Sequence, residues 1–401
     1  MPSSRVWLIP SPRSMAKAMK ILSIVGARPQ FVKIAPLVRA IEQRRKAHPQ
    51  NNLEHILVHT GQHYDAAMSE VFFAELDLPE AHFNLGVGSG LHGSQTGLML
   101  AGIEQVLLEV KPDVVVIYGD TNSTLAGALA SAKLHIPVTH VEAGLRSFRR
   151  EMPEEINRIV ADHVSDLLLA PTLTAMKNLA VEGLGARAAL TGDIMVDAVL
   201  HYRKLAGERS SLGARFGIES GNYGLVTVHR AENTDDLGRL RHLLAAFNQI
   251  ADSGLPLVFP VHPRTRQRIR AELADWTPHA QLKLIEPVGY LDMLWLLDHA
   301  YVALTDSGGL QKEAFFLGCP CVTLRDETEW VETVERGGNI LAGTDAARIR
   351  TALDHWRTPG CNGRAELSQA ASEAFGRGEA SVKILDALIR LVNSGRETRL
   401  H

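Results

Sequence analysis

The stretch VALTDSGGLQKE, residues 302–313, decides the fold. Its first four residues are apolar or β-branched, which is typical of a strand buried on both faces. The turn at Ser307, Gly308 and Gly309 then leads into a helical pattern, so the stretch predicts one strand–turn–helix unit of a parallel sheet. Such a turn leaves backbone N–H groups unobstructed at a helix N-terminus, which suits a diphosphate, although an ordinary glycine turn has the same sequence.

Similar units recur on both sides of this stretch. Strand-like runs cover residues 21–25, 55–58, 114–118, 138–141, 167–170, 225–228, 257–261, 283–285, 302–305 and 321–324. Helix-period segments include residues 98–109, 124–133, 236–251 and 346–355. This alternation predicts an α/β fold of two Rossmann-like, doubly wound domains that face each other across a cleft.

A polar stretch within residues 190–222 separates the two sets of strands. We therefore expect an N-terminal domain over residues 20–192 and a C-terminal domain over residues 193–379. Residues 1–19 look unlike the rest of the chain and are expected to form a disordered extension. A last helix, within about residues 380–401, could pack on either domain from its pattern alone.

Composition excludes several classes of protein. The chain has 401 residues, of which 45% are hydrophobic and 22% are charged, as in globular proteins of two or three domains. A net charge of −3 without a basic block argues against a nucleic-acid partner. No apolar run approaches the roughly 18 residues that span a membrane. Three cysteines support neither a disulfide framework nor a zinc site, so we expect a cytoplasmic protein without a metal.

Charged side chains follow the strands of the first half. Arg28 and Lys33 place two cations at the start of a helix, which predicts either an anion site or two solvated cations. Asp120 and Glu142 each follow an apolar run, and Glu154 opens a helix after a proline. Helix capping or the helix dipole would explain any one of these carboxylates. Carboxyl ends of parallel strands meet at one edge, however, so we expect all three carboxylates to converge on one cleft.

The second half adds two histidines and another carboxylate. His229 and His262 each end a strand, beside the turn that Ser307 begins. Glu313 lies one turn into the following helix, where a carboxylate could accept hydrogen bonds from ribose hydroxyls. These positions predict that the C-terminal domain binds a nucleotide.

Several motifs together are far more specific than any one of them. In chain order they are GARPQ (26–30) with Lys33, TGQHYD (60–65), GDT (119–121), HVEAGLR (140–146), PEEINR (153–158), HRAEN (229–233), DSGG (306–309) and RDETE (325–329). They resemble the non-hydrolysing UDP-N-acetylglucosamine 2-epimerases, over nearly the whole chain from residue 20 to about residue 391. The resemblance implies a glycosyltransferase-B-like fold, UDP held mainly by the C-terminal domain, a last helix packed on the N-terminal domain, and a homodimer.

The resemblance also implies roles for individual residues. The expected catalytic residues are Asp120, Glu142, Glu154 and His229. The residues expected to bind the UDP-N-acetylhexosamine substrate are Arg28, Lys33, Arg158, His229, Ser307, Gly308, Gly309 and Glu313. Gln62 and His63 match a second, regulatory nucleotide-sugar site of some family members.

The implied reaction interconverts UDP-N-acetylglucosamine and UDP-N-acetylmannosamine, for surface polysaccharide precursors. UDP is eliminated as the C2 proton leaves, which gives a 2-acetamidoglucal, and UDP then adds back, without any cofactor or metal. The chain departs from the family pattern at Gln30, where glutamate is frequent, and at Trp330, where arginine is frequent. These departures look more like relatives that act on UDP-2,3-diacetamido-2,3-dideoxy-glucuronate, so the same epimerisation of that sugar is the alternative.

Three other readings rank lower. A retaining UDP-sugar glycosyltransferase of the same fold would need an acceptor groove and would not use three acids on one domain. A hydrolysing epimerase would release free N-acetylmannosamine, and a non-catalytic sensor would bind the nucleotide sugar without turnover.

Overall fold

The computed structural model describes residues 18–50, 52–62, 73–358 and 361–398. Most of the expected N-terminal extension therefore lies outside the described residues. Met19 does not belong to such an extension, because it begins strand β1 (Met19–Val25). The backbone N–H of Met19 donates to the Asn52 carbonyl at 2.7 Å, and the Met19 side chain is buried.

The described residues of the N-terminal domain form a seven-stranded parallel sheet in the order β3-β2-β1-β4-β5-β6-β7. Its other strands are β2 (Leu53–His59), β3 (Phe83–Asn84), β4 (Val114–Tyr118), β5 (Val138–Val141), β6 (Leu167–Ala170) and β7 (Ala188–Leu190). Its helices are α1 (Arg28–Ala47), α3 (His92–Val110), α4 (Asn122–Lys133), α5 (Pro153–Val164) and α6 (Leu173–Val181), with a 3-10 turn at Gly185–Arg187.

The described residues of the C-terminal domain form a six-stranded parallel sheet in the order β10-β9-β8-β11-β12-β13. Its strands are β8 (Gly224–Thr227), β9 (Leu257–Pro260), β10 (Leu282–Ile285), β11 (Val302–Thr305), β12 (Cys321–Thr323) and β13 (Asn339–Leu341). Its helices are α9 (Ala231–Thr234), α10 (Leu237–Asp252), α11 (Pro263–Glu272), α12 (Tyr290–His299), α13 (Gly308–Phe316), α14 (Val331–Glu335) and α15 (Ala346–Arg357).

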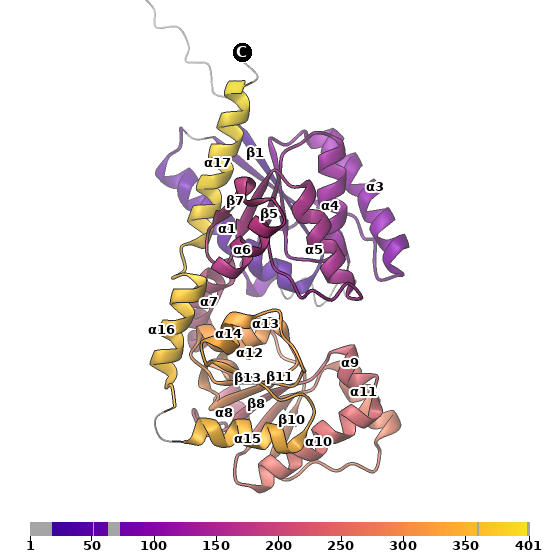
Figure 1. Ribbon diagram of the computed structural model, residues 1–401, viewed down its shortest axis with the longest axis vertical. Coiled ribbons are helices and arrows are strands. Elements are labelled where there is room, and N and C mark those ends of the chain that lie inside the picture. The colour runs from indigo at the N-terminus through magenta and orange to yellow at the C-terminus, as the bar shows by residue number, and fades with distance from the viewer. Residues whose placement is uncertain (1–17, 51, 63–72, 359–360, 399–401) are drawn as a thin grey trace, which may run out of the picture.

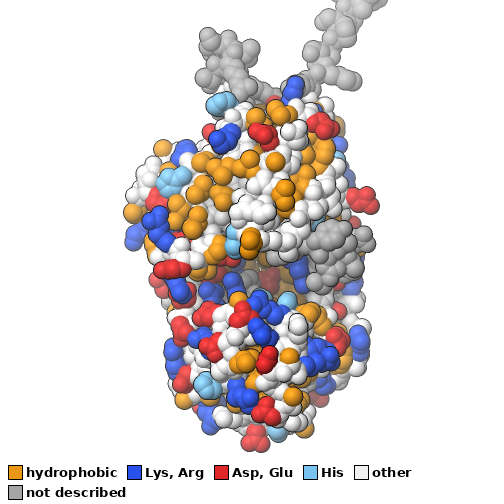
Figure 2. Space-filling model, turned by 90° about the vertical axis from the view of Figure 1, so that its right-hand side faces the viewer, with side chains coloured by type: hydrophobic (Ala, Val, Ile, Leu, Met, Phe, Trp, Pro, Cys, Tyr) orange, Lys and Arg blue, Asp and Glu red, His pale blue; other side chains and the backbone are white. Residues whose placement is uncertain are grey.

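The prediction of two doubly wound Rossmann-like domains is confirmed. Strand order reverses between β1 and β4 in the first sheet and between β8 and β11 in the second. Parallel sheets of this type bind ligands beyond the carboxyl ends of the strands at such a reversal. The two reversals therefore define where each domain contributes to a shared site, and Figure 2 shows the surface hollowed where the domains meet.

The chain passes between the domains twice, first along α7 (Ile194–Arg209) to α8 (Leu212–Phe216), and then from α16 (Arg364–Phe375) to α17 (Ala380–Thr398) (Figure 1). Helix α7 packs against α1 of the N-terminal domain and against α12 and α13 of the C-terminal domain. Helix α17 returns to the N-terminal domain and lies beside α1 and α7, where Arg44 pairs with Asp386 at 2.5 Å (Figure 1). The exact division at residues 192 and 193 stays a prediction.

The sequence did not indicate three of the strands. β3, β7 and β13 have two or three residues each and lie at or next to the outer ends of the two sheets. Runs this short carry too little apolar pattern to be recognised. By contrast, every residue of β4 is buried, as its continuous apolar run predicted. Among the described residues, no helix is long and apolar enough to cross a membrane.

Candidate active site

The turn between β1 and α1 is locked to the neighbouring strand by Gln30. Its Oε1 accepts from the backbone N–H of Gly26 at 2.7 Å and of Ala27 at 3.1 Å. Its Nε2 donates to the Tyr118 carbonyl at 2.8 Å and to Thr124 Oγ1 at 3.1 Å. An ionised glutamate at this position could not donate to a carbonyl. Gln30 is therefore a structural residue that fixes the turn carrying Arg28 against the end of β4.

Glu142 follows β5 and is buried against Lys33, as the sequence predicted for a charge placed directly after an apolar run. Lys33 Nζ lies 2.7 Å from Glu142 Oε2. Burial alone would raise the pKa of Glu142, but the ammonium groups of Lys312 and Lys33 hold this pKa well below its ordinary value. The Glu142 backbone has a φ of +73°, a left-handed conformation that costs a non-glycine residue roughly 1–3 kcal/mol. Such strain is typical of a functional side chain held in one direction.

Asp120 lies one strand away, at the end of β4. Arg158 Nη2 donates to Asp120 Oδ2 at 2.5 Å, and Asn157 Nδ2 donates to the Asp120 carbonyl at 2.9 Å. Burial would lower the pKa of Arg158, but the Asp120 carboxylate raises it above its ordinary value. The Asp120 side chain is 33% exposed, so its carboxylate stays accessible while Arg158 orients it.

The two glutamates that open α5 differ in environment. Glu155 is buried and accepts from the backbone N–H groups of Ser147 and Phe148, both at 2.9 Å. It also pairs with Arg158 at 2.7 Å, so it holds the preceding loop. Glu154 is half-buried, and within the described ranges no hydrogen bond or ion pair is found for it. Glu155 is thus structural, and Glu154 is the glutamate of α5 that has no structural task.

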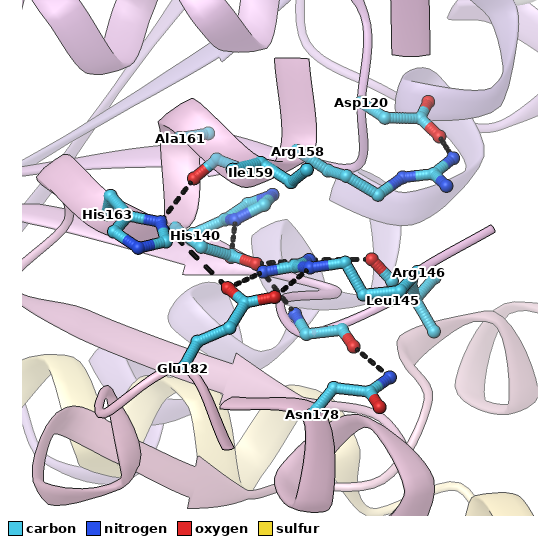
Figure 3. A network of polar contacts seen from close by, with 12 residues as sticks. Asp120, His140, Leu145, Arg146, Arg158, Ile159, Ala161, His163, Asn178 and Glu182 are labelled. Carbon is cyan, nitrogen blue, oxygen red and sulfur yellow. Dashed lines mark hydrogen bonds and ion pairs between the residues drawn. The ribbon is translucent and has the colours of Figure 1, made fainter. Parts of the chain in front are cut away.

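A buried network supports the loop that carries Asp120 (Figure 3). His140 Nδ1 lies 2.7 Å from Asp162 Oδ1, and its Nε2 lies 2.7 Å from the Gly119 carbonyl. Both ring nitrogens of His140 therefore have a buried oxygen partner. Asp162 also pairs with Arg146 at 2.8 Å, and Arg146 pairs with Glu182 at 2.7 Å.

His140 and Arg146 belong to a motif that the sequence singled out, but neither was expected to have a structural role. Two titratable residues in one short motif, His140 within the apolar run and Arg146 after it, were the signal that could have indicated a buried polar network.

His229 lies at the strand reversal of the C-terminal domain and is oriented by Asp306. Asp306 Oδ1 lies 3.1 Å from His229 Nδ1, and the buried Asp306 carboxylate also accepts from the backbone N–H groups of His229 and Arg230. The His229 ring remains 37% exposed. Burial lowers the pKa of the neighbouring His262, whose ring centroid is 5.7 Å from that of His229, and the charges of His229 and Arg28 lower it further.

The turn before α13 has the geometry that its sequence predicted. Ser307 caps the helix, with its side chain accepting from the Leu310 N–H at 3.4 Å. A Cβ on Gly308 would lie 2.4 Å from Glu329 Oε1, so a larger residue there would require the Glu329 side chain to move. A Cβ on Gly309 would meet only Ser307 Oγ, at 3.9 Å. The N–H groups at this helix start are thus left accessible on the Gly309 side.

Glu313 lies on the same helix, and its side chain is buried next to Tyr290. Burial raises the pKa of Glu313 to about 7, although Tyr290, Lys312 and Arg28 act in the opposite direction. Arg28 interacts electrostatically with both Glu75 and Glu313. Arg28, which the sequence predicted at an anion site of the N-terminal domain, therefore lies near Glu313 of the C-terminal domain.

The sequence pattern did not indicate Lys312 as a residue of the site. Lys312 extends from α13, and its Nζ lies 2.6 Å from Asp193 Oδ2 and 3.6 Å from Glu142 Oε2. The same Nζ lies 3.7 Å from the ring centroid of Trp330. A lysine directly before Glu313, near the start of the helix that Ser307 begins, was the available signal. Lys312 brings α13 of the C-terminal domain into contact with a carboxylate of the N-terminal domain.

The two residues of the expected regulatory site are only partly described. Gln62 Oε1 accepts from Ser123 Oγ at 2.7 Å and from the Ser123 backbone N–H at 3.2 Å, which links Gln62 to the start of α4. His63 lies outside the described residues. In the part of the chain that the structure covers, no group of three or more His, Cys, Asp or Glu side chains is arranged to hold a metal ion.

The fold and the site define a two-domain α/β protein of the glycosyltransferase-B-like type, with acidic and basic side chains gathered where the domains meet. A family model described as UDP-N-acetylglucosamine 2-epimerase matches residues 45–389. The chain belongs to the UDP-N-acetylglucosamine 2-epimerase family, whose members are isomerases.

Three relatives illustrate the similarity. A "UDP-N-acetylglucosamine 2-epimerase homolog" of Methanococcus maripaludis is 47% identical, over 93% of this chain and 100% of the relative. A "UDP-2,3-diacetamido-2,3-dideoxy-D-glucuronate 2-epimerase" of Pseudomonas aeruginosa is 46% identical, with the same coverage. The crystal structure of the Methanocaldococcus jannaschii UDP-GlcNAc 2-epimerase, in complex with UDP-GlcNAc and UDP, is 42% identical with a TM-score of 0.81, over 93% of this chain and 99% of that one.

Proposed function

We propose that this chain is a non-hydrolysing epimerase that interconverts UDP-N-acetylglucosamine and UDP-N-acetylmannosamine. The observation that carries the proposal is the pair of carboxylates at adjacent strand ends, with Asp120 held by Arg158 and Glu142 held by Lys33. The similarity to a UDP-GlcNAc 2-epimerase that was crystallised with UDP-GlcNAc and UDP supports the same substrate here.

The chemistry explains why both domains contribute. C2 of the sugar has no adjacent carbonyl, so its proton is too weakly acidic for simple removal and return. In the proposed reaction the anomeric C–O bond to UDP breaks as the C2 proton leaves, and the sugar becomes a 2-acetamidoglucal. Arg28, His229 and the N–H groups at Ser307–Gly309 would stabilise the departing diphosphate, each worth roughly 3–4 kcal/mol in the barrier. Re-addition of UDP with protonation on the other face completes the epimerisation.

The proton must leave from one face of the sugar and return on the other, so at least two acid–base groups are needed. Asp120 and Glu142 come from neighbouring strands but differ in exposure and in their cation partners. This difference suits two distinct roles. We assign the third expected carboxylate, Glu154, to the same set because Glu155 already has a structural task.

A second candidate function is the same C2 epimerisation of UDP-2,3-diacetamido-2,3-dideoxy-glucuronate. The 46% identical relative named for that activity favours it. Gln30 and Trp330 also stand where the family pattern often has glutamate and arginine. Gln30 is tied into the β1–α1 turn, whereas the Trp330 ring lies against Lys312, whose Nζ is 3.6 Å from Glu142 Oε2.

We further propose that two copies of the chain pair through α3. One face of this helix exposes Gly97, Leu98, Ala101 and Leu108, and the two leucines are 59% and 51% exposed. Figure 2 shows apolar side chains gathered on this side of the N-terminal domain. Exposed leucines along one helix are typical of contact surfaces, and in a two-fold dimer the same patch of each copy meets its equivalent. The nucleotide-sugar substrate and the three cysteines, which have no disulfide partner, fit a cytoplasmic enzyme of polysaccharide precursor synthesis.

Product analysis tests the proposed function. Each nucleotide sugar is incubated with the protein, and the mixture is resolved by chromatography at equilibrium. We expect UDP-N-acetylmannosamine to accumulate from UDP-N-acetylglucosamine; turnover of only the diacetamido-glucuronate nucleotide would establish the second candidate instead. Stoichiometric free N-acetylmannosamine would indicate hydrolysis, and binding without any product would indicate a sensor.

A further inference from the structure

Lys312 is a charged side chain that is almost completely buried. Only 2% of its side chain is exposed, and Asp193 and Glu142 are similarly buried at 1% and 6%. A buried ammonium group is stable only when nearby negative charge compensates its lost hydration. Asp193 supplies that charge at 2.6 Å, and Glu142 lies 3.6 Å away on the other side. Asp193 also caps α7, where its Oδ1 accepts from the Met195 N–H at 2.8 Å. Lys312 therefore joins this structural carboxylate to a proposed catalytic one.

Trp330 completes the surroundings of Lys312. Its ring lies 3.7 Å from the ammonium nitrogen, a distance at which an aromatic face attracts a cation. An arginine at position 330, as the family pattern often has, would put a second cation against Lys312. The tryptophan and the lysine therefore suit each other, which explains the departure at Trp330 by a contact within this chain.

Glu142 has two cation partners of different origin. Lys33 comes from α1 of its own domain, so this contact persists whatever the C-terminal domain does. Lys312 comes from α13, the helix whose first turn is the proposed diphosphate site. Only the second contact depends on how the two domains are placed relative to each other.

On the basis of the proposed function, we propose that Lys312 is a positioning residue. It reaches across from the nucleotide-binding helix to keep Glu142 ionised and directed toward α13, so that this carboxylate is set for proton transfer only when the C-terminal domain is in place. Asp193 anchors Lys312 for this task, and Trp330 covers it.

The charged groups around the pair define what its loss would do. Lys33, Lys312 and His140 face Glu142, whereas Asp193 and Glu313 face Lys312. An opposite charge within about 4–6 Å of a carboxylate lowers its pKa by about 1–3 units. Without Lys312, burial would be opposed mainly by Lys33, so the pKa of Glu142 would rise.

The test distinguishes the effect of Lys312 on Glu142 from its neutralisation of the Asp193 charge. Replacing Lys312 alone would leave Asp193 buried and uncompensated, so the test variant is Lys312→Gln combined with Asp193→Asn. Asp193→Asn alone is the matched control, because it keeps Lys312 beside Glu142. Proteins labelled with ¹³C at the glutamate carboxyl are titrated by NMR, and the Glu142 signal is identified by its absence in Glu142→Gln.

We expect the Glu142 signal of the double variant to titrate at least about 1 pH unit higher than that of Asp193→Asn. Its turnover should be at least tenfold lower, because Glu142 loses the contact that directs it toward α13, while the Kd for UDP changes less than threefold. Equal midpoints, or equal turnover in the two variants, would overturn the proposal. If the double variant does not fold, the titration of the wild-type protein still tests the proposal. A Glu142 titration midpoint at or above the ordinary value of about 4.3 would contradict the proposal. The titration needs no substrate, so it is read independently of whether the wild-type protein epimerises either sugar.

Discussion

Asp120 and Arg158 form a 2.5 Å contact that joins the end of β4 to α5. Arg158 is itself fixed by Glu155 at 2.7 Å, so the guanidinium is held in place before it meets Asp120. His140 contacts the same loop through the Gly119 carbonyl. The carboxylate at this strand end is therefore oriented by buried groups on two sides, which is what a proton-transferring group requires.

Removal of either oriented carboxylate should separate catalysis from binding. Asp120→Asn and Glu142→Gln are each expected to lower kcat by about 10²–10⁴-fold, because general acid–base groups contribute rates of that order. The Kd for UDP, measured by calorimetry, should stay within threefold, since neither carboxylate is among the residues expected to bind UDP. Near-normal turnover in both variants would remove these residues from proton transfer, and Asp354→Asn on α15 is a surface control.

The two glutamates of α5 should behave oppositely. Glu155→Gln is expected to destabilise the fold by about 2–3 kcal/mol, because it weakens two backbone hydrogen bonds and leaves Arg158 without one of its partners. Glu154→Gln should leave the melting temperature nearly unchanged and still reduce kcat at least tenfold. Thermal unfolding and initial-rate measurements on the same preparations check both statements. If Glu154→Gln kept full activity, the catalytic set would shrink to the residues at the strand ends.

Glu313 predicts a specific pH dependence of stability. Burial raises its pKa to about 7 in the folded chain, against 4.5 in the unfolded chain. The folded state thus binds a proton more tightly, and this stabilisation, complete below pH 4.5, is lost as the pH rises through 7. Glu313→Gln removes the titration, so from pH 5 to pH 8 the ligand-free variant should gain on the order of 2 kcal/mol relative to wild type. Parallel stability curves, measured by denaturant unfolding, would show that Glu313 does not titrate in this range.

The exposed face of α3 gives a prediction about assembly. Leu98→Glu would place like charges opposite each other across a two-fold axis, so a dimer through this face should dissociate to monomers. Analytical ultracentrifugation at micromolar concentration is the measurement, with Leu284→Glu on β10 as a control of similar chemistry. A dimer that survives Leu98→Glu would exclude α3 from the interface.

The sequence predicted the fold well because parallel strands buried on both faces are continuous apolar runs, as β4 illustrates. It also placed His229 and Ser307 at strand ends, where the topology brings them to one edge. What it could not predict were partners distant along the chain. Lys312 and Glu142 are 170 positions apart, and only the packing of α13 against the N-terminal domain brings them within 3.6 Å.

The choice between neighbouring acids was a second gap. Glu154 and Glu155 are equivalent in a pattern of helix-opening carboxylates, and only the path of the loop at Ser147 shows which of them is buried. Similarly, the sequence showed Gln30 only as a departure from a family pattern, whereas its hydrogen bond to the Tyr118 carbonyl shows a structural function.

Proton NMR in D₂O tests the central claim most directly. The protein is incubated with UDP-N-acetylglucosamine, and the C2 proton signals of both epimers are followed with time. We predict that deuterium enters C2 as UDP-N-acetylmannosamine forms, because the proton leaves from one face of the sugar and a deuteron from the solvent is added to the other face. If the manno epimer appeared with its C2 proton fully retained, or if neither exchange nor product occurred with this sugar or with the diacetamido-glucuronate nucleotide, the elimination and re-addition of UDP would be contradicted.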